Sequence, residues 1–89
     1  MEIANVAASS ATFAIRTELC PQVLCRLLGL IAQQGRLVDR VEARRRARSL
    51  HVSLSIAGID RQQAEIVAAK MRSLVPVRNV SLVTPTSLP

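Results

Sequence analysis

The chain has 89 residues, a length that allows one small domain, and 49% of them are hydrophobic. Phe13 is the only aromatic residue, so we expect a core of Leu, Val, Ile and Ala, and base recognition by aromatic stacking is disfavoured. The formal net charge of +6 indicates an acidic partner or a solvated basic face, and two cysteines with one histidine are too few ligands for a tetrahedral metal site.

The first part of the chain predicts a strand followed by a helix. Residues 1–10 are small and polar with little periodicity, and we expect them to be frayed. Thr12 to Arg16 alternates between apolar and polar residues, which is typical of a strand. Pro21 suits the first position of a helix, whose apolar stripe continues to Gln34. Gly35 can then adopt the left-handed conformation that ends a helix.

A hairpin is predicted next. The three-residue spacing of Val38 and Val41 breaks strict alternation, so we expect a bulge in this strand. Arg45 to Arg48 is predicted to form the turn. From Leu50 to Ile56 every second residue is apolar, which indicates a strand with one buried face, and Gly58 ends it.

A second helix and a last strand follow. Asp60 is predicted to cap this helix, with Gln63 completing a capping box. The apolar stripe of the helix consists of Ala64, Val67, Ala68, Met71 and Leu74. Pro76 prevents the helix from continuing, Val77 to Val83 predicts the last strand, and residues 84–89 are expected to be a flexible tail.

The order of these elements, β-α-β-β-α-β, predicts an α+β fold. We expect a ferredoxin-like sandwich over residues 11–83, with a four-stranded antiparallel sheet and both helices on one of its faces. The other face of the sheet would carry Ser, His and Arg side chains. Because many functions share this fold, the function has to be inferred from particular sites.

Half of the cationic residues lie between Arg36 and Arg48. Asp39 and Glu42 lie among them and are interpreted as their ion-pair partners. We predict that this segment and the polar sheet face contact a protein partner, through Arg36, Arg40, Arg44 and His51. The alternative interpretation is a solvated hairpin that its charge protects from aggregation.

No pattern in the sequence indicates catalysis. His51 has no evident Cys, Ser or acidic partner, and there is no phosphate loop, carboxylate pair or nucleophile elbow. Cys20 and Cys25 are expected to be free thiols, which fits a reducing cytoplasm. The chain opens with Met1-Glu2 and without a basic segment, so we expect no signal peptide, and no apolar run is long enough to cross a membrane. We therefore expect a cytoplasmic, non-catalytic protein without a metal or cofactor of its own.

Several segments resemble the ACT domain, most closely the form found in acetolactate (acetohydroxyacid) synthase small subunits. The matching patterns are Pro21-x-x-Leu24-x-Arg26-Leu27-Leu28-Gly29-Leu30, Gln33-x-Gly35, Leu50-x-Val52-x-Leu54 and Leu74-Val75-x-Val77-x-x-Val80. The resemblance covers roughly Thr12 to Val83. It implies a homodimer with a continuous sheet that activates a larger catalytic subunit. That subunit would carry the thiamine diphosphate, Mg²⁺ and FAD.

The chain departs from this family at the effector site. In the small subunits that bind valine, the first loop has a sequence pattern similar to N-x-x-G, and another Asn follows the glycine that ends the helix. The matching positions here are Leu19, Gln22 and Leu37, so the resemblance implies a degenerate effector site. Gln22 would also crowd the approach of a ligand to the backbone. These departures, and the end of the chain directly after the domain, resemble the short, valine-insensitive small subunits.

Two other functions stay open. The first is a stand-alone ACT dimer that senses an amino acid or another small ligand at the loop from Leu19 to Val23. The second is an RNA-binding ferredoxin-like domain, which the basic charge favours and the shortage of aromatic residues disfavours.

Overall fold

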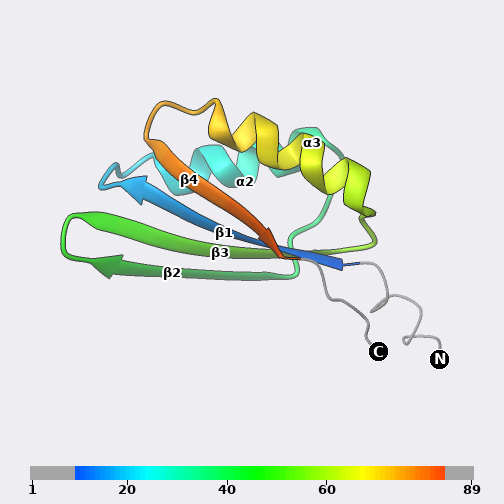
Figure 1. Cartoon of the computed structure of the whole chain (residues 1–89), viewed down its shortest axis with the longest axis horizontal. Helices are drawn as coiled ribbons and strands as arrows, with labels where there is room; N and C mark the ends of the chain where they lie inside the picture. Colours follow the sequence, from blue (N-terminus) through cyan, green and yellow to red (C-terminus); the bar gives the residue numbers. More distant parts are fainter. Residues whose placement is uncertain (1–9, 84–89) are drawn as a thin grey trace.

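The computed structural model of the chain describes residues 10–83. The elements occur in the predicted order: β1 (Ser10–Glu18), α2 (Val23–Gln33), β2 (Arg40–Arg46), β3 (Ser49–Ala57), α3 (Arg61–Arg72) and β4 (Val77–Val83) (Figure 1). Ser10, expected to be frayed, is the first residue of β1. The other predictions for the two termini, residues 1–9 and 84–89, lie outside the described residues.

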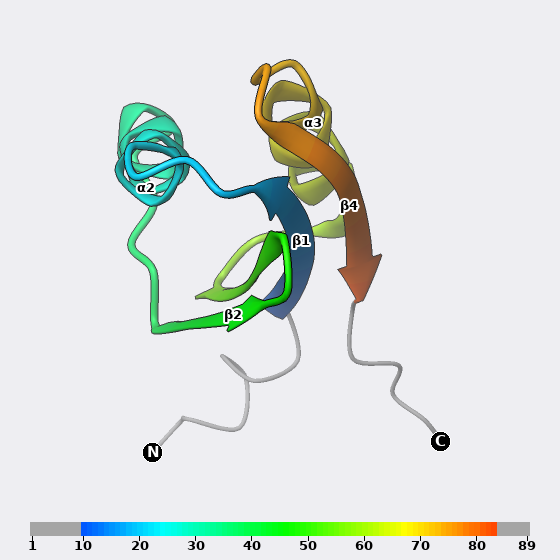
Figure 2. The same cartoon turned by 90° about the vertical axis from the view of Figure 1, so that its left-hand side faces the viewer.

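The four strands form one sheet in the order β2-β3-β1-β4, and all neighbouring strands are antiparallel. Both helices lie on the same face of this sheet, with α3 above β1 and β4 and α2 beside it (Figure 2). The prediction of a ferredoxin-like sandwich is therefore confirmed. We call the sheet face opposite the helices the outer face.

The core lies between the sheet and the two helices. Phe13 is fully buried (0% exposed), and the register places it between Leu54 on β3 and Leu82 on β4. The buried side chains from the helices are Val23, Leu27 and Ile31 of α2 and Ala64, Val67, Ala68 and Met71 of α3. Apart from Phe13 and Met71, the buried hydrophobic residues are Leu, Val, Ile and Ala, as the composition predicts.

Two helix ends differ from the predictions in detail. Helix α2 begins at Val23 instead of Pro21, because the segment before it forms a turn in which the Val23 N–H donates to the Cys20 carbonyl at 3.2 Å. The prediction for its other end is confirmed, since α2 ends at Gln33 and Gly35 has a φ of 72°.

Asp60 caps α3 as predicted, but the capping box is not completed. The Asp60 Oδ1 accepts the Gln63 N–H at 2.8 Å. The Gln63 side chain instead accepts a hydrogen bond from the Arg36 guanidinium, which also donates to the Gly58 carbonyl at 2.6 Å. The Arg36 side chain thus links the segment after α2 to the start of α3.

The hairpin turn is shorter than predicted. Only Ala47 and Arg48 form it, because Arg46 already pairs with Ser49. The bulge expected in this strand is not found, because the register of β2 against β3 is unbroken from Arg40 to Arg46. Directly before the strand, the Asp39 N–H donates to the Ser55 carbonyl at 2.8 Å.

Strand β2 is an edge strand, and all seven of its residues are exposed. Neither helix covers the inner face of β2, so Val41, which points to that side, is 42% exposed. An irregularity lies at the opposite edge, where the register between β1 and β4 shifts between Arg16 and Thr17.

Candidate functional site

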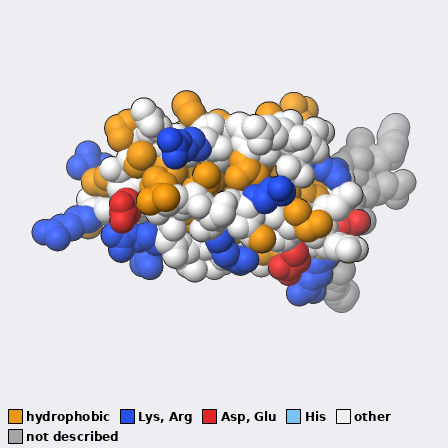
Figure 3. Space-filling model, turned by 90° about the horizontal axis from the view of Figure 1, so that it is seen from above, with side chains coloured by type: hydrophobic (Ala, Val, Ile, Leu, Met, Phe, Trp, Pro, Cys, Tyr) orange, Lys and Arg blue, Asp and Glu red, His pale blue; other side chains and the backbone are white. Residues whose placement is uncertain are grey.

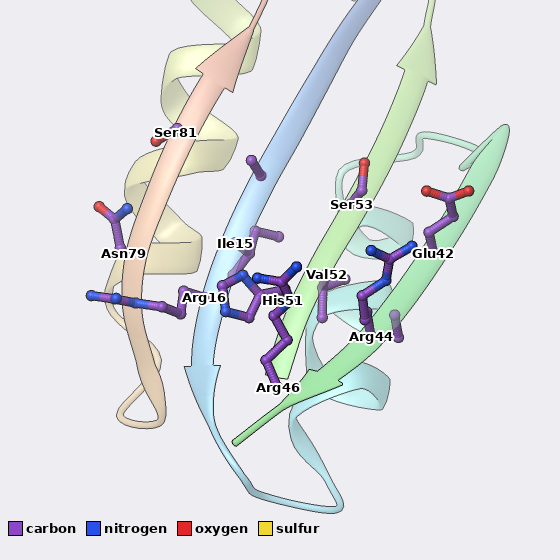
Figure 4. Close-up of a pocket in the computed structure, with 12 residues that line it drawn as sticks. Ile15, Arg16, Glu42, Arg44, Arg46, His51, Val52, Ser53, Asn79 and Ser81 are labelled. Carbon is purple, nitrogen blue, oxygen red and sulfur yellow. The ribbon is translucent and has the colours of Figure 1, made fainter. Parts of the chain in front are cut away.

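The outer face of the sheet is not covered by the helices, and the strand register arranges its side chains in rows. One row crosses all four strands and consists of Asn79 on β4, Arg16 on β1, His51 on β3 and Arg44 on β2. We call it the basic row. The neighbouring row consists of Ser81, Ala14, Ser53 and Glu42. Figure 4 shows these side chains standing on the open side of the strands.

Together the two rows and Arg46 line an open trough with a volume of about 850 Å³. The small side chains of Ser53 and Ser81 form one part of its surface, with Ala14 between them in the register, and longer basic side chains border the other. We call this depression the outer trough. Its lining is mostly polar, and it offers hydroxyl, amide and guanidinium donors to a molecule placed on the sheet.

The charges on this face are unbalanced. Glu18 forms an ion pair with Arg78 at 3.0 Å, and Glu42 lies 3.7 Å from Arg40. Both outer-face carboxylates of the described strands therefore already have a cationic partner outside the basic row. Within residues 10–83, the remaining guanidinium groups of this face form no ion pair or hydrogen bond: those of Arg16, Arg44 and Arg46.

The four residues predicted to contact a partner do not all share one surface. Arg44 and His51 belong to the basic row, and Arg40 lies on the same face of β2, at the other end of the strand from the turn. Arg36 lies apart from them, on the side of α3, where its guanidinium is bound to Gly58 and Gln63. His51 is exposed, and its Nε2 lies 3.2 Å from the hydroxyl of the nearby Ser49.

Two members of this surface were not singled out from the sequence. Arg16 and Asn79 lie far from the basic segment in the chain, and only the sheet register brings Arg16 beside His51 and Asn79 beside Arg16 in the same row. The interpretation of the acids was correct only for Glu42. Asp39 accepts the Ala57 backbone N–H at 2.6 Å, so within the described residues it fixes the end of the hairpin instead of pairing with an arginine.

The three residues of the predicted effector site do not meet within one chain. Leu19 and Gln22 lie before α2, in the loop that joins it to β1. Leu37 lies after the other end of α2 and is 81% exposed. An 11-residue helix is roughly 16 Å long, and Figure 1 shows the two connections at opposite ends of the domain. A site that uses all three residues would need a second copy of the chain.

The helix side has a different character. Hydrophobic side chains are exposed there in a broken band between basic ones (Figure 3). Both thiols are free, with Cys20 half-buried and Cys25 exposed on α2. Within residues 10–83, no cluster of His, Cys, Asp and Glu side chains is arranged to hold a metal ion. Neither α2 nor α3 has the length and apolarity needed to cross a membrane.

Comparison with protein families decides the assignment of this domain. The model of the ACT-like domain family matches residues 4–88. The chain belongs to the ACT-like domain family. ACT domains are typically regulatory and non-catalytic, which agrees with the absence of a catalytic pattern in the sequence. A comparison with curated proteins finds no match.

Solved structures similar to this ACT-like domain share its fold at low sequence identity. The ACT domain from GTP pyrophosphokinase of Chlorobium tepidum has a TM-score of 0.73 at 15% identity, with 84% of this chain and 97% of that chain covered. The regulatory subunit of aspartate kinase from Thermus thermophilus has a TM-score of 0.70 at 11% identity, with 86% of this chain and 52% of that chain covered. The C-terminal domain of the MgtC protein from Mycobacterium tuberculosis has a TM-score of 0.71 at 7% identity, with 89% of each chain covered.

Proposed function

We propose that this ACT-like domain is a regulatory small subunit of acetolactate synthase, which binds as a dimer to the catalytic subunit and raises its activity without feedback by valine. The observation that carries the proposal is the segment from Pro21 to Gly35. Its sequence resembles that of acetolactate synthase small subunits, and it forms α2 with Gly35 at positive φ directly after the C-cap residue.

The free edge of β2 supports the proposed dimer. Arg46 and Ser49 close a two-residue hairpin, and the two residues of such a closing pair form backbone hydrogen bonds with each other. Along β2 every second residue from Arg46 is therefore bonded to β3, and the residues between them turn their N–H and C=O groups away from β3. These groups of Val41, Ala43 and Arg45 consequently face the free edge. A second copy that pairs here would extend the sheet and cover the exposed side chain of Val41.

The edge formed by β4 is less suited to this pairing. Strand β4 carries the register shift opposite Arg16 and Thr17, and such an irregularity interrupts the row of backbone groups that a second strand needs. We therefore favour β2 as the edge that joins the two copies. The helices of both copies would then lie on the same side of one continuous sheet.

The residues at the ends of α2 support insensitivity to valine. Leu19 and Leu37 are exposed apolar side chains. Both stand at positions that match an Asn in the pattern of the valine-binding small subunits. Neither can form hydrogen bonds to the charged ends of an amino acid. Gln22, at the N-cap of α2, makes no side-chain capping bond, and its bulk replaces the glycine of that pattern.

The proposal is tested with the purified catalytic subunit of acetolactate synthase from the same source. Acetolactate formation is measured with and without the full chain, at rising chain concentration and with or without valine. We expect a saturable rise in rate that valine does not reverse, and co-elution of the two proteins. An unchanged rate without co-elution would contradict the proposal.

Matched arginine variants show which surface contacts the catalytic subunit. Arg40→Ala and Arg44→Ala remove charges from the outer face, whereas Arg36→Ala removes one from the side of α3. Each variant lowers the net charge by the same amount. Because the Arg36 side chain is already bound within the fold, we propose that the outer-face variants weaken co-elution more. A larger effect of Arg36→Ala would place the contact on the helix side.

A second candidate function is a stand-alone ACT dimer that senses a small ligand. It is favoured by the similarity to the regulatory subunit of aspartate kinase and to the ACT domain of GTP pyrophosphokinase. A ligand that binds the folded domain raises its melting temperature. A thermal-shift series with the twenty amino acids separates the two functions, because the small-subunit proposal predicts no shift with valine.

A further inference from the structure

The outer trough contains more positive charge than the fold neutralises. Three guanidinium groups, those of Arg16, Arg44 and Arg46, line it together with one carboxylate, that of Glu42. Glu42 lies in the row of small residues and pairs with Arg40, at 3.7 Å. In the basic row Arg16 and Arg44 flank His51 directly, one on each neighbouring strand. Like charges on one open face repel one another weakly through water, and an anion bound between them replaces this repulsion with attraction.

From this arrangement we propose that the outer trough binds the phosphate chain of a small polyphosphate anion. Neighbouring strands are about 4.8 Å apart, so the Cα atoms of Arg16 and Arg44 are separated by about twice that distance. Their side chains are long enough to reach a common ligand above His51. A guanidinium forms two parallel hydrogen bonds to a phosphate, and a chain of several phosphates can engage more than one arginine at once.

The remaining lining fits the same chemistry. Ser53 and Ser81 offer hydroxyl groups, and Asn79 offers an amide at the β4 end of the basic row. Ala14 stands between the two serines in the neighbouring row, so its methyl group leaves the space above the sheet open. A volume of about 850 Å³ is within the range of small-molecule sites.

The same surface is poorly suited to reading nucleic-acid bases. Phe13 is the only aromatic residue of the chain, and it is buried on the inner face of the sheet. Among the residues that line the outer trough, the imidazole of His51 is the one ring on which a base could stack. Aromatic stacking on several rings, the main source of single-strand affinity beyond phosphate contacts, is therefore not available there. It follows that a nucleoside attached to the phosphate chain adds little to binding.

Isothermal titration of the full chain with sodium tripolyphosphate tests the proposal, with ATP as a second titrant in metal-free buffer. We expect one site per chain, similar affinity for the two titrants, and weaker binding as salt rises. The double variant Arg16→Ala/Arg44→Ala is expected to lose at least tenfold in affinity. Arg44→Lys keeps the charge but loses the planar fork, and is expected to show an intermediate loss.

The matched control is Arg26→Ala/Arg61→Ala, which removes two exposed guanidinium groups from α2 and α3 and gives the same net charge. It is expected to bind tripolyphosphate as the natural chain does. Circular dichroism of every variant establishes that the fold is retained. Because the titration needs no catalytic subunit, its result is independent of the proposed activation of acetolactate synthase.

Several outcomes would overturn the proposal. Equal losses in the two double variants would mean attraction by net charge alone, and no heat of binding at low salt would mean that no such site exists. A much higher affinity for ATP than for tripolyphosphate would place the ligand elsewhere. Tighter binding of a poly-glutamate peptide or of single-stranded RNA than of tripolyphosphate would assign the outer trough to those partners.

Discussion

At the scale of single residues, Ala47 is in an unfavourable backbone conformation. Its φ of 48° lies in the left-handed region, and within residues 10–83 no other residue except glycine has a positive φ. The conformation costs an alanine roughly 1–2 kcal/mol, because its Cβ approaches the following carbonyl. The two-residue turn between the paired residues Arg46 and Ser49 favours this conformation, because turns with a positive φ match the twist of the two strands.

We predict that Ala47→Gly stabilises the domain. Removing the Cβ relieves this strain, while the larger entropy of glycine in the unfolded chain offsets part of the gain, which leaves about 0.5–1 kcal/mol. In a domain of this size that corresponds to a rise in melting temperature of roughly 2–8 °C, measured by thermal circular dichroism. The control is Ala43→Gly within β2, where φ is not positive. That substitution should lower the melting temperature, and a fall in both variants would contradict the prediction.

Arg36 and Arg40 show that the make-up of the site depends on where side chains lie in the fold, which their order in the sequence does not determine. The two residues are four positions apart in one basic segment, and both were predicted to contact a partner. The start of β2 lies between them, so that Arg36 binds the start of α3 and Arg40 lies on the outer face. Charge alone carries no information on which side of a sheet a side chain will lie.

At the scale of elements, Asp60 gives α3 a side-chain cap that α2 lacks. Its Oδ1 accepts the Gln63 N–H at 2.8 Å, whereas Gln22 at the N-cap of α2 makes no such bond. We predict that Asp60→Ala lowers the free energy of unfolding by about 1 kcal/mol, as measured by urea denaturation. Gln22→Ala should leave it within about 0.5 kcal/mol. Equal effects of the two substitutions would contradict the prediction that the Asp60 side-chain bond stabilises α3.

The accuracy of the predictions followed the burial of each element. Strand β3 was predicted well because one of its faces is buried, from Val52 to Ile56, and burial produces the alternation seen in the sequence. In β2 every residue is exposed, so no alternation marks its ends, and the predicted turn began two residues too early.

The basic row could not be predicted from the sequence for a related reason. It depends on the register of β1 and β4 against β3 and β2, which is fixed by the buried side chains on the opposite face.

At the scale of the whole molecule, the charges on β2 select one register for the proposed dimer. With Val41 opposite Val41 of the second copy, Arg40 and Glu42 form two opposite-charge pairs across the interface. A pairing centred on Glu42 sets two carboxylates against each other. A pairing centred on Ala43 also gives Glu42 a cationic partner, but it sets Arg40 against Arg46. The register centred on Val41 is therefore the most favourable one, and it keeps the arginines at the hairpin end apart.

The variant Arg40→Glu tests this register through the dissociation constant of the dimer, measured by sedimentation equilibrium. In the register centred on Val41 the introduced carboxylate lies opposite Glu42 of the second copy, and we predict at least a tenfold weaker dimer. In the register centred on Ala43 the same change would create an attraction to Arg46 and strengthen the dimer. The two registers thus predict changes of opposite sign.

Two further variants separate this effect from net charge. The exchange Arg40→Glu/Glu42→Arg restores both opposite-charge pairs, so the dimer should regain most of its affinity. Arg44→Glu makes the same charge change as Arg40→Glu on the same face of the same strand, but it lies outside the pairs of the register centred on Val41. It should leave the dissociation constant within about threefold, a difference of ~0.7 kcal/mol. An equal loss in Arg44→Glu and Arg40→Glu would mean that no specific pairing of β2 strands takes place.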